Sequence, residues 1–220
     1  MTIPVEKQVS LAKCALDSGV AFVLFDWMYH YVTDESPMDL NSFLKYFTPE
    51  ECKRIMFLDG ITKSLGASNI RNCHLIADEA VIKFITARAS HGVIPSFYSL
   101  AVAMAAYEMG FAEAAKTISE PTNASRIVLK KLLAESGLQH IIGKGYYAFM
   151  NVGEYIKAKG WADTEPLGQY LAENHGVAVV PGAFFSPFGG EWVRFSYATP
   201  AERTEGAFKM LVEGLEGLKK

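Results

Sequence analysis

Apolar residues recur at helical spacing at the start of the chain and then give way to short continuous runs. Residues 4–17 repeat apolar side chains every three or four positions, which predicts a helix that ends at Gly19. The run 20–25 is apolar throughout and predicts a strand. Continuous apolarity is typical of a parallel strand buried on both faces, so we expect helices on both sides of this part of the sheet.

The pattern continues as an alternation of strands and helices. It predicts strands at 54–58 and 73–77 and helices at 39–46, 80–89, 96–109 and 121–137. The last helix is amphipathic, with Ile127 and Leu133 on its apolar side and Arg126 on its polar side. Strands at 146–152, 177–180 and 191–197 and helices at 167–175 and 202–218 follow. This order indicates an α/β layered sheet followed by a small α+β domain, with the boundary near residue 120.

Composition narrows the class of protein. The chain has 220 residues, is 50% hydrophobic and carries a formal net charge of −3, which fits a compact core and gives no basic surface for nucleic acid or an anionic membrane. No apolar run is long enough to cross a bilayer, and no secretory signal precedes the first helix. Three cysteines without C-x-x-C spacing favour a reducing compartment, so we expect a cytoplasmic protein. The five histidines lack the spacing of a metal site.

Three residues of the first third form a candidate cofactor site. Lys63 is an amine that can form an imine, Arg71 follows eight residues later with a guanidinium suited to phosphate, and Asp26 ends an apolar strand. A carboxylate at a strand end can face a protonated pyridine nitrogen. Together these residue types predict a site for pyridoxal 5'-phosphate.

The chain resembles the fold-type I pyridoxal-phosphate enzymes of the aspartate aminotransferase superfamily, classes I and II. The matching stretches occur in the family's order and are Asp26-x-x-Tyr29, 63–71, 171–185 and 193–198. The resemblance implies that residues 1–120 form a large cofactor-binding domain truncated at its N-terminal side. It implies that residues 121–220 form the small C-terminal domain.

The resemblance also implies a role for each matching residue. Lys63 would carry the Schiff base and move the proton at the substrate Cα as general base and acid. Asp26 would bind the pyridine nitrogen, Tyr29 would donate a hydrogen bond to the phenolic oxygen of the ring, and Arg71 would bind the phosphate. Arg194 would bind the α-carboxylate of the substrate and so orient the Cα bond that breaks.

These roles imply an aminotransferase that moves an amino group from an L-amino acid to a 2-oxo acid. Two alternatives remain open: a non-catalytic fragment that acts through a partner chain, and a β-lyase. Because the missing half of the large domain would leave apolar surface open, we expect a homodimer. Phe184, Phe185 and Phe188 favour an apolar substrate if they line the site, but we expect them to belong to the core of the small domain.

Overall fold

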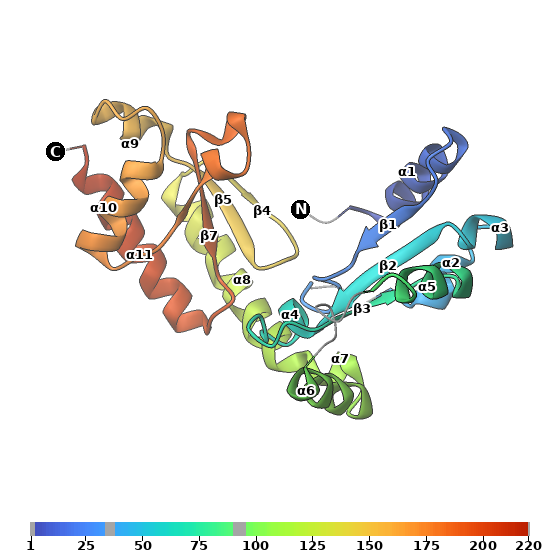
Figure 1. The fold of residues 1–220 in the computed structure, drawn as a ribbon. Coiled ribbons are helices and arrows are strands. Elements are labelled where there is room, and N and C mark those ends of the chain that lie inside the picture. Colours follow the sequence, from blue (N-terminus) through green and yellow to red (C-terminus); the bar gives the residue numbers. More distant parts are fainter. Residues whose placement is uncertain (1–2, 34–37, 90–95, 220) are drawn as a thin grey trace. The chain divides into compact units, whose positions relative to one another are not determined.

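The computed structural model describes residues 3–33, 38–89 and 96–219. The chain divides into two compact units, residues 2–119 and residues 120–220, which we call the N-terminal and C-terminal units. One long helix, α8 (Lys116–Ser136), runs through the boundary (Figure 1). Each unit has its own sheet.

The N-terminal unit contains a three-stranded sheet of order β1-β2-β3. Its elements are α1 (Val5–Asp17), β1 (Val23–Asp26), α2 (Leu40–Leu44), α3 (Pro49–Cys52), β2 (Ile55–Gly60), α4 (Ile61–Ser64), β3 (Cys73–Ile76), α5 (Glu79–Thr86), α6 (Phe97–Glu108) and α7 (Phe111–Ala114). Strand β1 is parallel to β2, with Asp26 opposite Leu58. Strand β3 is antiparallel to β2, with Cys73 opposite Gly60.

Aromatic side chains form the core on one face of this sheet. The Phe25 and Phe57 rings stack with centroids 5.3 Å apart, and Phe43 of α2 meets Phe25 edge-on at 5.1 Å. Ala12 and Leu16 of α1 close the same cluster. Such aromatic pairs add to the area that they bury, so this cluster fixes α1 and α2 against β1 and β2 (Figure 1).

The first strand is shorter and less buried than the sequence predicts. It begins at Val23 rather than at residue 20, and its side chains alternate between half-buried and exposed positions. Phe22 is 47% exposed and Leu24 is 50% exposed, so the expectation of burial on both faces is wrong for the described structure. The reason is that β1 is an edge strand and α1 covers only the face of Phe25. A continuous apolar run shows that a strand could be buried on both faces, but it does not show that other elements cover both faces.

Several helices agree closely with the sequence pattern because capping residues mark their starts. Asp78 accepts a hydrogen bond from the backbone N–H of Ala80 at the start of α5, and Ser96 accepts one from Ser99 at the start of α6. Helix α8 instead begins five residues before the predicted start, with Pro121 inside its first turns. Pro121 is the sixth residue of α8, where its missing N–H removes a hydrogen bond to the carbonyl of Thr117, and the sequence pattern therefore placed the start of the helix there.

The assignment of faces on α8 needs a second correction. Arg126 is 2% exposed, and its guanidinium donates to the carbonyl oxygen of Gly145 at 3.1 and 2.9 Å. Ile127, predicted on the apolar side, is 72% exposed. The buried guanidinium is stable because a carbonyl from a neighbouring turn accepts hydrogen bonds from its N–H groups. The apolar periodicity of one helix cannot predict such a contact with another segment.

The C-terminal unit contains an antiparallel four-stranded sheet of order β4-β5-β7-β6. Its elements are β4 (His140–Ile142), β5 (Tyr147–Asn151), α9 (Gly153–Ala158), α10 (Glu165–His175), β6 (Val180–Pro181), the short 3₁₀ turns η2 (Gly182–Phe184) and η3 (Pro187–Gly189), β7 (Trp192–Ser196) and α11 (Ala201–Gly217). Strand β4 and helix α9 were not predicted, and β6 has two residues where the sequence pattern predicts a strand at 177–180. These elements have three, six and two residues, so each covers too few positions for its sequence pattern to identify it.

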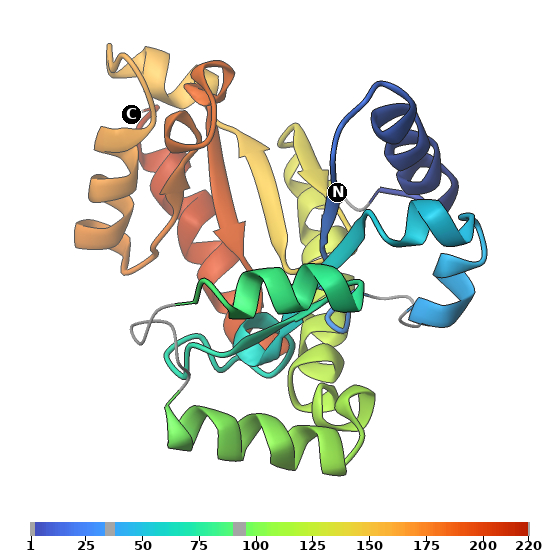
Figure 2. The same cartoon turned by 45° about the vertical axis from the view of Figure 1, so that its right-hand side comes forward.

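The two faces of this sheet differ in burial. Ala148, Met150, Val193 and Phe195 are fully or almost fully buried on one face, where Phe195 meets Phe208 of α11. Helices α10 and α11 lie side by side in this unit (Figure 2). The alternate residues of β5 and β7, which point to the opposite face, are half-buried, except Ser196, which is exposed.

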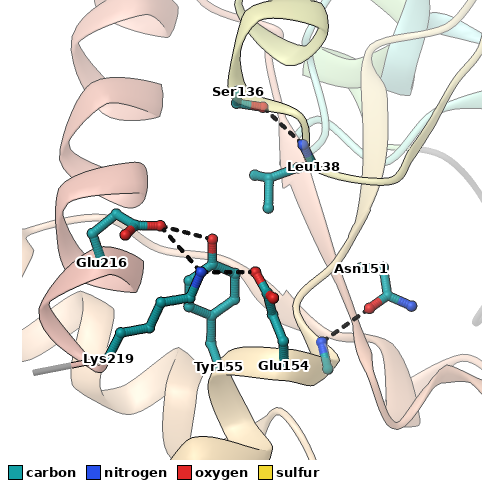
Figure 3. A network of polar contacts seen from close by, with 8 residues as sticks. Ser136, Leu138, Asn151, Glu154, Tyr155, Glu216 and Lys219 are labelled. Atoms are coloured by element: carbon teal, nitrogen blue, oxygen red, sulfur yellow. Dashed lines mark hydrogen bonds and ion pairs between the residues drawn. The ribbon is translucent and has the colours of Figure 1, made fainter.

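A network of polar contacts links the end of the chain to α9 (Figure 3). The Tyr155 hydroxyl donates to Glu216 Oε1 at 2.9 Å, and Lys219 Nζ lies 3.0 Å from Glu154 Oε1. The Lys219 ammonium also lies 4.3 Å from the centre of the Tyr155 ring. Because Tyr155 is buried and its hydroxyl bonds to a carboxylate, the pKa of Tyr155 is raised to about 12. The network therefore fixes α11 against α9.

No helix in the described ranges is long and apolar enough to span a membrane.

Candidate functional site

The candidate site of the N-terminal unit lies where two parallel strands end. Asp26 is the last residue of β1, and the N–H of the next residue, Trp27, donates to the carbonyl of Leu58 in β2 at 2.8 Å. The exposed Asp26 carboxylate accepts a hydrogen bond from the Met28 N–H at 3.1 Å, which turns the chain away from the strand. Carboxyl ends of parallel strands are the usual place for ligands in α/β sheets.

Lys63 follows strand β2 without an intervening loop. Strand β2 ends at Gly60, helix α4 begins at Ile61, and Lys63 therefore lies in the first turn after the strand. Its Nζ is 5.9 Å from the centre of the Tyr29 ring, which itself follows β1 by three residues. No carboxylate within residues 3–33, 38–89 or 96–219 forms an ion pair with this amine. The amine is thus held beside a phenol and is not neutralised by an acid.

Arg71 lies at the end of the loop that follows α4. Its backbone is left-handed, with φ 59°, which is rare for a residue with a side chain. The exposed guanidinium donates to the carbonyl of Ser68 at 2.9 Å and keeps most of its N–H groups free for a ligand. A strained residue with a free fork of donors is typical of an anion-binding position.

Two hydroxyl side chains flank Lys63. Thr62 Oγ1 is 3.5 Å from the Asn72 carbonyl. Ser64 is fully buried, and its Oγ has no hydrogen-bond partner in the described part of the chain. A buried hydroxyl without a partner costs free energy. The Ser64 hydroxyl, next to Lys63, is therefore available to form a hydrogen bond that the described residues do not provide.

Gly60 fixes the turn between β2 and α4. A Cβ atom at this position would lie 2.7 Å from the Cα of Cys73 and 2.8 Å from the carbonyl oxygen of Asn72. The close approach of two backbones requires glycine here. Lys63 is therefore positioned by a tight contact between β2 and the start of β3.

Asp59 is a residue of the site that the sequence reasoning missed. It is 7% exposed, and its carboxylate accepts the N–H of Gly60 at 2.7 Å. Burial, with a further contribution from the charge of Asp26, raises the pKa of Asp59 to about 7. Burial raises the pKa values of Tyr31 and Tyr107, and the charge of Asp59 adds to both shifts. The sequence offered one signal that could have identified Asp59: it is a charged residue at the end of an apolar strand, four positions before Lys63.

The raised pKa of Asp59 predicts a pH dependence of stability. The folded state binds this proton more tightly than the unfolded chain, so the free energy of unfolding falls as pH rises from the ordinary value, 3.8, to about 7 and loses no more above it. Asp59→Asn keeps an acceptor for the Gly60 N–H and cannot ionise. Wild type should therefore lose stability between pH 4 and pH 8 that the variant keeps. The free energy of unfolding of the variant minus that of wild type should increase by about 2 to 4 kcal/mol over this range.

Urea denaturation at several pH values measures this difference, and the exposed Asp17→Asn is the control for the loss of one negative charge in the same unit. An Asp59→Asn difference that is constant from pH 4 to pH 8 would show that the carboxyl has an ordinary pKa.

Arg194 lies in β7 of the C-terminal unit. Its Cζ is 4.3 Å from the centre of the Tyr147 ring and 4.6 Å from the centre of the Phe185 ring. Within the ranges that the structure describes, no carboxylate pairs with this guanidinium. Of the five candidate residues, Asp26, Tyr29, Lys63 and Arg71 belong to the N-terminal unit, and Arg194 belongs to the C-terminal unit.

The three phenylalanines near Arg194 in sequence are not core residues. Phe184 is 64% exposed, Phe185 is 49% exposed and Phe188 is 92% exposed, so the expectation that they fill the core is wrong. They lie in and between the short 3₁₀ turns after β6, in which Gly182 is the one buried residue. Within the described ranges, no group of three His, Cys, Asp or Glu residues is arranged to hold a metal ion.

Comparison with known proteins identifies the family. The family model of aminotransferase class I and II matches residues 3–211, and the chain belongs to this family. The aspartate aminotransferase of Pyrococcus horikoshii is 28% identical over 99% of this chain and 54% of its own length. The aromatic-amino-acid aminotransferase 2 of Thermococcus litoralis is 28% identical over 76% of this chain and 42% of its own length. The chain thus spans about half the length of these curated relatives.

Solved structures confirm the α/β class of the fold. The crystal structure of an aromatic aminotransferase from Pyrococcus horikoshii superposes with a TM-score of 0.79 at 20% identity. The match covers 98% of this chain and 56% of that structure. The fold resemblance expected from the sequence therefore holds over nearly the whole chain.

Proposed function

We propose that this protein is a pyridoxal-phosphate-dependent aminotransferase that moves an amino group from an L-amino acid to a 2-oxo acid. The observation that carries the proposal is the position of Lys63, one turn after β2, beside Tyr29 and without an acidic partner in the described ranges. Membership of the aminotransferase class I and II family, shown by the match over residues 3–211, supports it.

The residues of the N-terminal unit fit this cofactor. The Lys63 amine suits the aldehyde of the cofactor, and the Tyr29 phenol suits its phenolic oxygen. The Asp26 carboxylate at the strand end suits the pyridine nitrogen, and the Arg71 guanidinium with its free donors suits the phosphate. When bound, pyridoxal phosphate supplies an electron-withdrawing ring that stabilises negative charge at the substrate Cα. We assign the N-terminal unit to the cofactor-binding domain and the C-terminal unit to the small domain.

Each residue has a defined task in this proposal. Lys63 Nζ attaches the cofactor and moves the proton at the substrate Cα. Asp26 accepts a hydrogen bond from the ring nitrogen, and Tyr29 donates one to the ring oxygen. Arg71 binds the phosphate, and Arg194 binds the α-carboxylate of the amino acid.

The experiment that tests this function follows both products. The purified protein is incubated with pyridoxal phosphate, an L-amino acid and a 2-oxo acid acceptor, and new amino acid and ammonia are measured. Transamination gives one new amino acid for each donor consumed and requires the acceptor. Release of ammonia without an acceptor would support a β-lyase, and no reaction would leave the non-catalytic fragment as the better account.

We also propose that the protein is a homodimer, because α6 presents apolar side chains on every side. Phe97 is 80% exposed, Tyr98 is 81% exposed and Met104 is 60% exposed, while only small residues of α6 are buried. A helix that is apolar all round is normally covered, so a second copy of this chain is the proposed cover.

Cys14, Cys52 and Cys73 are free, which supports a reducing, cytoplasmic setting.

The variant Tyr98→Glu with Met104→Glu should convert the dimer to a monomer, because two buried carboxylates in an apolar interface are costly. Light scattering after size exclusion at micromolar concentration gives the mass. Ile127→Glu is the control, since Ile127 is an exposed apolar residue of α8, 72% exposed. A wild-type protein that is a monomer at this concentration would contradict the proposal.

A further inference from the structure

One face of the C-terminal sheet combines a single cation with aromatic side chains. The register of the strands places Phe149 of β5 and Val180 of β6 directly opposite Arg194, and Ile141 of β4 opposite Phe149. Residues directly opposite each other point to the same face. We call this surface the Arg194 face; its strand residues are Ile141, Tyr147, Phe149, Asn151, Val180, Trp192, Arg194 and Ser196.

Phe185 adds a further ring to this face from outside the sheet. Its ring meets that of Phe149 edge-on with centroids 5.7 Å apart, and it lies 4.6 Å from Arg194 Cζ. Tyr147 contacts the same guanidinium at 4.3 Å. The face is open to a ligand, because Phe185 is 49% exposed and Ile141 is 45% exposed.

The contact with two rings prepares Arg194 for a carboxylate. Aromatic faces attract the guanidinium but do not accept its N–H groups as a carboxylate does. Ring contacts also restrict the rotamers of a long side chain, which lowers the entropy lost on binding. The N–H groups of Arg194 thus remain available for a bidentate bond to one carboxylate.

The strand residues of the Arg194 face provide no second cation. Apart from Arg194, those listed above are apolar, aromatic or uncharged. A ligand held by one carboxylate on Arg194 would place the rest of its skeleton against Tyr147, Phe149 and Phe185. A second carboxylate in that position would lose hydration without gaining a partner from this face.

We propose that the Arg194 face binds monocarboxylates with an aromatic or large apolar remainder, and that the amino acid substrate belongs to this class rather than to the dicarboxylic amino acids. The identification of the ligand as a substrate rests on the proposed function. The binding preference itself is a property of the C-terminal unit and does not require a cofactor.

The test compares two carboxylates that lack an amino group and cannot react. 3-Phenylpropionate and succinate are titrated into the full chain by isothermal calorimetry, without cofactor. The inference predicts that 3-phenylpropionate binds roughly tenfold more tightly than succinate. Arg194→Leu should abolish binding of both.

Two matched variants separate the role of the ring from a change in folding. Phe185→Ala should lower the affinity for 3-phenylpropionate by about five- to tenfold and that for succinate by much less, because succinate uses this ring only through the orientation of Arg194. Phe188→Ala removes the same side chain from a site that is 92% exposed and should change neither affinity. Succinate binding as tightly as 3-phenylpropionate, or no measurable binding of either, would overturn the inference.

The outcome also separates the inference from the proposed function. If 3-phenylpropionate binds as expected but the protein transfers no amino group from any donor, the proposed function fails and the binding preference stands. If transfer is observed with aspartate and not with phenylalanine as donor, the inference fails and the proposed function stands.

Discussion

Lys63→Ala is expected to abolish amino transfer, with a loss of about 10³-fold or more in rate. The variant lacks the amine that attaches the cofactor and that moves the proton at the substrate Cα, and general acid–base catalysis alone contributes about 10² to 10⁴-fold. The rate is measured as formation of the new amino acid at saturating donor. Because Lys63 is half-buried and forms no ion pair in the described ranges, the fold should be retained.

Two controls isolate the chemistry of this amine. Lys63→Arg keeps the positive charge but not the nucleophile, and it should be as inactive as the alanine variant. Lys83→Ala removes a surface lysine that pairs with Glu79 in α5 and should keep full activity. Activity of Lys63→Arg close to that of wild type would show that Lys63 acts only through its charge.

Gly60→Ala is expected to lower the free energy of unfolding by about 2 to 4 kcal/mol. The added methyl group would meet the backbone of Asn72 and Cys73 at distances below 3 Å, and neither backbone group can rotate away as a side chain could. Relief requires β2 and β3 to separate, which breaks the pairing that positions Lys63. Urea denaturation measures the loss, and cofactor binding should weaken with it.

Gly206→Ala is the matched control for this substitution. Gly206 lies inside α11, and a Cβ there would meet nothing within 4 Å. Alanine is the better helix former, so this variant should be as stable as wild type or more stable by up to about 1 kcal/mol. Equal stability of Gly60→Ala and wild type would mean that the two strands do not approach as closely as described.

The sequence predicted best the features that depend on local chemistry. The apolar spacing predicted α5 and α6 to within three residues of their ends, and in the structure Asp78 and Ser96 cap the starts of these helices. The order of the three strands along the chain in the first unit was also predicted, because helical patterns and loops separate their apolar runs. Lys63 could be singled out because Arg71 and Asp26 stand at spacings that one chemistry explains.

Features that depend on contacts between distant segments could not be predicted in the same way. The burial of Arg126 requires the carbonyl of Gly145, nineteen residues away. The exposure of Leu24 depends on which elements cover β1, and the raised pKa of Asp59 depends on burial at the end of β2. Periodicity along one element carries no information about such partners.

The central claim is that Lys63 attaches pyridoxal phosphate, and the most direct test is an absorbance spectrum. Wild type and Lys63→Ala are mixed with pyridoxal phosphate, freed of excess, and recorded before and after borohydride. The account predicts a visible band in wild type that borohydride removes while fixing the cofactor to the chain, and no such band in Lys63→Ala. A wild-type protein without the band, or a variant that retains it, would contradict the account.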